Sequence, residues 1–187
     1  MALRTRIAPD DCIQQYEEAA AERQAAERQE AGFLLLATGS ALGVEMLALS
    51  VEMVLKAAYF RLIGYATARK IEKTDLRDAE VDIHSLGVSE PSQGFHNLVF
   101  WAEALIALHK NGLSNRLHGG RSYVAIPAQP LLAADEASLR RCAVRLATNW
   151  DIGDRYKSLE PHASKQDLED VLDDAVAIIH LYEQGRV

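Results

Sequence analysis

A long apolar helix with a narrow polar face is the feature that most constrains this chain. Residues 41–63 are predominantly apolar and predict a helix at the centre of the fold. The polar side chains at its start and within it follow offsets of seven, seven and four residues, so they share one face at about 3.6 residues per turn. They are Thr38, Glu45, Glu52 and Lys56, and we call them the polar seam. Function is to be sought among such polar residues.

Composition limits the classes of protein to consider. The chain has 187 residues, 49% hydrophobic and 25% charged, which fits one globular domain over 1–187. A net charge of -7 argues against a surface coated with positive charge, although it leaves room for a local basic patch. The first ten residues lack the apolar core of a secretory signal, so we expect none. Two cysteines are too few for a disulfide framework, and no charge-free run is long enough to span a bilayer. We therefore expect a cytoplasmic protein with no membrane contact.

Helical periodicity predicts an all-α bundle of about five helices. The expected segments are an N-terminal helical arm over 1–31, a central helix over 38–66 and bundle helices over 95–111, 135–151 and 164–184. A short helix is also expected in the connector between the central helix and residue 95. Residues 113–132 lose the pattern and contain several glycines and prolines, which predicts a loop insertion with one short extended piece over 122–126.

Four short motifs follow one another along the chain. Residues 51–57 contain Glu, three residues and then Lys-Ala in an apolar helix, and residues 95–98 contain a His-Asn-Leu helix start. Arg155 and Tyr156 come after the fourth expected helix, and residues 164–182 form the last helix with an acidic first half. In this order the motifs resemble the HEPN family, small helical domains named for nucleotide binding in higher eukaryotes and prokaryotes. The chain has Asn where that family has Asp in the second motif.

The resemblance implies a homodimeric module that binds RNA or a nucleotide in a defence, toxin-antitoxin or stress system, together with a cognate partner protein. Ribonucleases of the family use Arg, four to six residues and then His, which implies Arg155 and His162 as the catalytic pair of a metal-independent endoribonuclease. Arg77 and His84 have the same spacing. No paired Glu-x-x-His elements occur, so we expect neither a metal nor a cofactor.

A basic strip on the fourth expected helix is a second candidate for phosphate binding. It consists of Arg140, Arg141 and Arg145, continued by Arg155. The alternative is that these arginines are scattered on the surface and pair with the acidic last helix.

The seam residues Glu52 and Lys56, with His96 and Tyr156, complete the expected nucleotide contacts. Glu52 and Lys56 are four residues apart, so they equally fit an ion pair on a solvated stripe or between helices. His96 equally fits a helix-capping or core-edge histidine. A small-molecule pocket lined by the seam with Glu45 is a further hypothesis.

A function of a different class is also open. In this alternative the chain is a non-catalytic protein-protein interaction domain that dimerises or acts as a scaffold, and its arm over 11–31 packs on a partner or a second copy. The salt dependence of binding distinguishes the two hypotheses. RNA or nucleotide binding should weaken steeply with salt, because phosphate contacts release counterions, whereas salt-insensitive binding of a partner favours the interaction domain.

Overall fold

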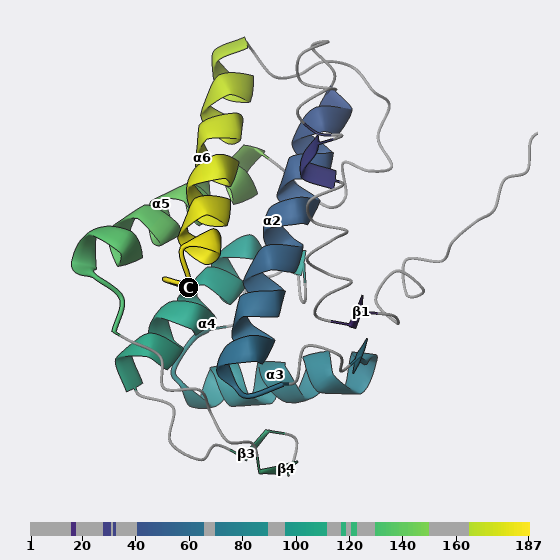
Figure 1. Ribbon diagram of the computed structural model, residues 1–187, viewed down its shortest axis with the longest axis vertical. Coiled ribbons are helices and arrows are strands. Elements are labelled where there is room, and N and C mark those ends of the chain that lie inside the picture. The colour runs from purple at the N-terminus through teal and green to yellow at the C-terminus, as the bar shows by residue number, and fades with distance from the viewer. Residues whose placement is uncertain are drawn as a thin grey trace, which may run out of the picture.

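The computed structural model is an all-α helical bundle, as the helical periodicity of the sequence predicted (Figure 1). The structure describes residues 16–17, 28–30, 32, 41–65, 70–89, 96–111, 117–118, 121–122, 130–149 and 165–187. Its helices are α2 (Ala41–Leu62), α3 (Lys73–Ser85), α4 (Leu98–Asn111), α5 (Ala133–Asn149) and α6 (Lys165–Glu183). No helix in the described ranges is long and apolar enough to cross a bilayer.

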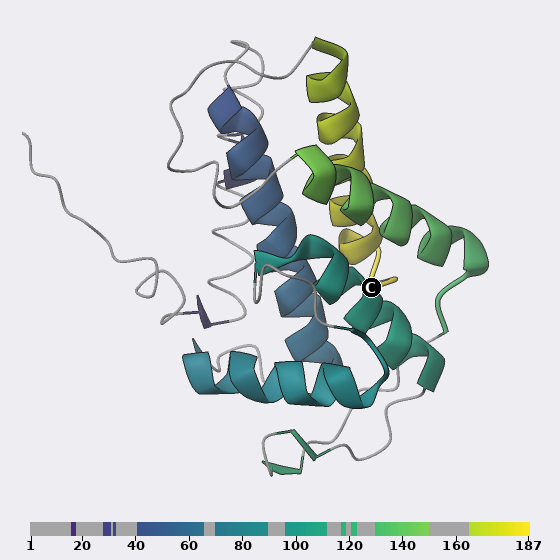
Figure 2. The same ribbon diagram turned by 180° about the vertical axis from the view of Figure 1, so that it is seen from behind.

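Helix α2 is the centre of the bundle and packs against α4 and α6, while α5 packs against both α4 and α6. The two opposite views show α3 lying across the end of α2 at the base of the molecule (Figures 1 and 2). Trp101 on α4 is fully buried and meets Tyr59 of α2 edge-on, with 5.4 Å between the ring centroids. Aromatic packing of this kind fixes how α4 lies against α2.

The central helix ends where a glycine permits the chain to turn. Gly64 has a φ of 91°, in the left-handed region that side chains with a Cβ rarely adopt. Its N–H donates to the Arg61 carbonyl over 3.0 Å, and the Tyr65 N–H donates to the Phe60 carbonyl over 2.9 Å. This pair of bonds satisfies the last carbonyls of α2 and turns the chain toward α3. Tyr65 then holds α3 through its hydroxyl, which donates to Asp75 Oδ1 over 2.7 Å.

Short strand pairs link segments outside the helices. β1 (Tyr16–Glu17) pairs antiparallel with β2 (Lys70–Ile71), and β3 (Leu117–His118) pairs antiparallel with β4 (Arg121–Ser122). The prediction of a helical arm over 1–31 is therefore wrong at residues 16–17, because pairing with β2 satisfies that backbone in place of helical bonds. Residues 28–30 are helical, and the rest of the arm lies outside the described residues.

Candidate functional site

Two residues of the polar seam meet a histidine from another segment inside the bundle. Glu52 and Lys56 lie one turn apart on α2, and Lys56 Nζ donates a hydrogen bond to Glu52 Oε1 over 2.5 Å. His96 lies just before α4, with its Nδ1 3.1 Å from Glu52 Oε1 and 3.3 Å from Glu52 Oε2. The structure thus brings together three residues predicted as nucleotide contacts, and we call them the buried cluster.

The buried cluster joins two elements and is not a solvated stripe. Exposed fractions are 6% for the Glu52 side chain and 10% for Lys56, whereas His96 keeps 24%. Trp101 of α4 covers the ammonium of Lys56, with 5.5 Å between Nζ and the ring centroid. Because water is largely excluded from Glu52, its interactions with both nitrogens are stronger than they are in bulk solvent.

The neighbour of His96 caps α4, which leaves the imidazole available for the buried cluster. Asn97 Oδ1 accepts a hydrogen bond from the Phe100 N–H over 2.9 Å, and the Asn97 carbonyl accepts one from the Trp101 N–H over 3.3 Å. Asn and Asp make the same N-terminal cap with a side-chain oxygen. Asn97 therefore caps the start of α4 as an Asp at this position could.

Glu52 is held in its charged form. Burial alone would raise the pKa of this carboxyl, since it removes water from the carboxylate. The ammonium of Lys56 and the hydrogen bond from His96 outweigh that effect and lower the pKa of Glu52 from 4.5 to about 2. Near neutral pH, Glu52 is therefore a carboxylate that accepts hydrogen bonds and donates none.

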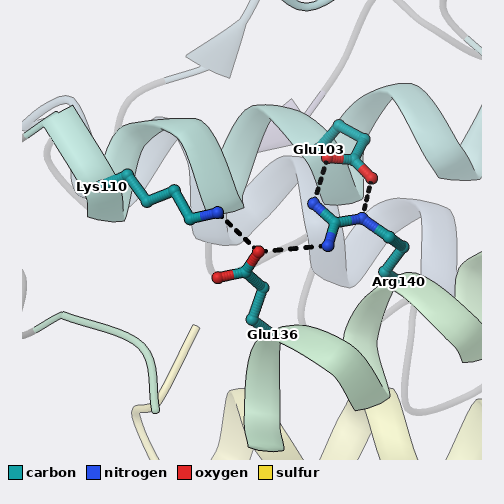
Figure 3. A network of polar contacts seen from close by, with 4 residues as sticks. All are labelled: Glu103, Lys110, Glu136 and Arg140. Atoms are coloured by element: carbon teal, nitrogen blue, oxygen red, sulfur yellow. Dashed lines mark hydrogen bonds and ion pairs between the residues drawn. The ribbon is translucent and has the colours of Figure 1, made fainter. Parts of the chain in front are cut away.

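Arg140 of the expected basic strip is engaged by carboxylates of its own chain. Its Nε and Nη2 donate to the two oxygens of Glu103 on α4, over 2.5 and 2.8 Å (Figure 3). Glu136 accepts from Arg140 Nη1 over 3.1 Å and from Lys110 Nζ over 2.6 Å. The hydrogen bond to Glu103 raises the pKa of Arg140. This network ties α4 to α5 and uses the hydrogen-bonding edge that a phosphate would need.

The two other arginines of the strip have different surroundings. Arg145 Nη2 donates to Asp174 Oδ1 on α6, the pairing with the acidic last helix that was the alternative interpretation. Asp174 also borders Cys142. Burial is the main cause that raises the pKa of the Cys142 thiol, and its hydrogen bond to Asp174 raises this pKa further. Arg141 is exposed and donates from Nη2 to Ser138 Oγ over 3.4 Å, with no carboxylate partner among the described residues.

The predicted catalytic pair lies outside the described residues. This applies to Arg155 and His162 as well as Tyr156, so their convergence stays a prediction. The second pair with the same spacing, Arg77 and His84, lies on α3. Seven residues of helix separate their Cα atoms by about 10 Å along the axis.

Sequence reasoning named the acidic last helix as an alternative partner of these arginines, but it did not single out the individual carboxylates. Asp174 was one of several carboxylates in the acidic half of the last helix, yet only 2% of its side chain is exposed. Its place between Val171 and Ile178 on the apolar face was the available signal, because these positions share one side of a helix. Glu103 and Glu136 gave no such signal, since their pairing depends on how α4 and α5 are packed together.

Neither a metal-binding cluster in the described residues nor a similar known protein helps to identify the ligand of this site. Across the described ranges, no three or more His, Cys, Asp or Glu side chains gather in a way that would hold a metal ion. A scan against protein-family models found no match, and neither curated proteins nor solved structures gave one.

Proposed function

We propose that this protein is a HEPN-like module that binds RNA or a nucleotide in a defence, toxin-antitoxin or stress system. The observation that carries the proposal is the contact between His96 and Glu52, which are 44 residues apart in the chain. Each belongs to one of the motifs on which the resemblance rests. Their convergence at 3.1 Å supports reading these motifs as parts of one site.

The surroundings of the buried cluster suit a phosphate. The cluster combines one carboxylate with an ammonium and an imidazole, so it is cationic when His96 is protonated. His96 also lies at the N-terminal end of α4, where the helix dipole favours negative charge. Arg141 is the strip arginine whose guanidinium is exposed without a carboxylate partner in the described part of the chain. It is therefore the best candidate for a further phosphate contact.

Binding of a fluorescein-labelled single-stranded RNA, measured by anisotropy over a range of salt concentrations, tests the proposal. We expect affinity to fall steeply with salt, and Arg141→Ala to lower the slope of log K against log salt by about one. Arg77→Ala is the matched control, because Arg77 is an exposed arginine on a different helix, α3. The absence of salt-dependent binding to RNA and to nucleoside triphosphates would refute the proposal.

The proposal extends to catalysis, in which the protein cleaves the RNA that it binds as a metal-independent endoribonuclease. Arg155 and His162 are the expected catalytic pair. Cleavage of a mixed structured and single-stranded RNA pool in the presence of a chelator is the test. Loss of cleavage in both Arg155→Ala and His162→Ala would support the pair, and chelator-sensitive cleavage would contradict metal-independent chemistry.

The second candidate function is a protein-protein interaction domain. Its partner can be a second copy of the same chain, which is the expected homodimer. The observation in its favour is that Val144 on α5 and Val176 on α6 are 45% and 43% exposed on two helices packed together. Sedimentation velocity of the wild type and of Val144→Asp with Val176→Asp tests it. A dimer that dissociates in the double variant supports this surface, whereas a monomeric wild type contradicts the homodimer.

A further inference from the structure

The contact with Glu52 decides which ring nitrogen of His96 carries the proton. Nδ1 lies 3.1 and 3.3 Å from the two oxygens of Glu52. An ionised carboxylate only accepts hydrogen bonds, so Nδ1 must be the donor. In the neutral imidazole the hydrogen is therefore on Nδ1, and Nε2 has a free lone pair.

The carboxylate that imposes this tautomer is itself fixed. Glu52 is buried, and Lys56 holds it from one turn further along α2 over 2.5 Å. Lys56 in turn lies against Trp101, which is fully buried between α2 and α4. Glu52 thus orients the imidazole from a rigid part of the core, as buried carboxylates do for histidines that transfer protons.

The His96 side chain is only partly buried. The His96 side chain is 24% exposed, and Glu52 is its hydrogen-bond partner within the described part of the chain. Nε2 therefore has no protein partner there and is available to a bound molecule. The start of α4 lies beside it and favours an anionic group such as a phosphodiester.

We infer that His96 is a catalytic general base for RNA phosphodiesters, acting through Nε2, and that Glu52 is its positioning residue. This inference rests on the proposed RNA-binding function. It assigns proton transfer to a group other than the expected pair of Arg155 and His162.

The reaction that this geometry supports is an internal transesterification. His96 Nε2 accepts the proton of a ribose 2′-hydroxyl while the 2′-oxygen forms a bond to the adjacent phosphorus. The bond between phosphorus and the 5′-oxygen breaks, and that oxygen takes a proton from the solvent. The imidazolium then returns its proton to the solvent. The products are a 2′,3′-cyclic phosphate and a 5′-hydroxyl, and no metal, oxidant or reductant takes part.

The direct test uses a labelled oligonucleotide with a single ribose among deoxyribose positions, with a chelator present. We expect the wild type to cut after the ribose and to leave a cyclic phosphate, detected by mass spectrometry. His96→Gln keeps a donor for Glu52 but cannot take up the proton, so kcat/KM should fall by about a hundredfold or more. Kd for the uncleavable all-deoxy strand should change far less than kcat/KM. His180→Gln, an exposed histidine on α6, is the control and should cleave normally.

Three results would overturn the inference. RNA that is bound but not cleaved by the wild type removes the catalytic role and leaves the proposed function standing. Normal cleavage by His96→Gln removes His96 from the reaction. The absence of any RNA binding refutes the proposed function and this inference with it.

The role of Glu52 has its own measurement, which does not require RNA. Nitrogen-15 NMR of the histidine side chains should show His96 with hydrogen on Nδ1 in the neutral ring. Glu52→Gln should weaken this tautomer preference, because its amide offers Nδ1 a donor as well as an acceptor. It should also alter the pH dependence of kcat/KM and retain the helical circular dichroism spectrum. A wild-type His96 with hydrogen on Nε2 contradicts the arrangement, even where Glu52→Gln is too unstable to study.

Discussion

Replacing Glu52 by Gln should remove a large stabilising interaction from the bundle. The fall of its pKa from 4.5 to about 2 on folding corresponds to about 3 kcal/mol, at about 1.4 kcal/mol per pKa unit. The variant also leaves Lys56 buried without a carboxylate, and breaking a buried ion pair in this way costs about 3 to 5 kcal/mol. We therefore expect Glu52→Gln to lower the free energy of unfolding by about 3 to 5 kcal/mol near neutral pH.

Urea denaturation at several pH values measures this loss. Because the folded-state pKa of Glu52 lies below its ordinary value, the stabilisation is complete above about pH 4.5 and is lost as the pH falls toward about 2. The difference between wild type and Glu52→Gln should shrink over that range. Glu103→Gln is the control, since Glu103 pairs with a partly exposed arginine and should cost under about 1 kcal/mol. A loss for Glu52→Gln that is as small, or independent of pH, would refute the reasoning.

The remaining predictions concern the backbone, the second buried carboxylate and the thiol. Gly64→Ala should lower the free energy of unfolding by about 1 kcal/mol or more in urea denaturation, because Gly64 has a φ of 91°. Arg145→Ala should cost about 1 to 3 kcal/mol in the same assay, since it leaves the buried Asp174 without its cation. In a Cys12→Ser background, iodoacetamide should modify Cys142 slowly in the native protein and quickly in urea, because burial raises the pKa of that thiol.

Most of the hydrophobic core could be predicted, because the spacing of apolar residues shows which face of each helix is buried. Leu98, Trp101, Leu105 and Leu108 recur at helical spacing, and all four are buried. Leu146 on α5 and Ile178 on α6 also follow the apolar periodicity of their helices, and both have no exposed area. Propensity alone misjudged residues 16–17, since tertiary pairing with β2 decides their conformation and the local sequence does not.

The site was predictable only in part, because periodicity shows which residues share a face but not which faces meet. Spacing correctly put Glu52 and Lys56 together on α2, whereas the arrival of His96 from a segment 44 residues away depends on how α4 packs. The partner of Arg140 is Glu103, on a different helix, for the same reason. A strip of arginines in a sequence therefore indicates basic residues without indicating how much of their charge stays available for a ligand.

The buried cluster is better explained by function than by stability. A buried ion pair contributes little over well-packed apolar residues of similar volume, so Glu52→Leu with Lys56→Met should cost less stability than either single change. The same double variant removes the carboxylate acceptor that fixes the tautomer of His96. A variant that folds as well as the wild type and has lost RNA cleavage would separate the two roles. A variant that folds and still cleaves would show that the Glu52 carboxylate is dispensable, and the role of His96 would then have to be argued without it.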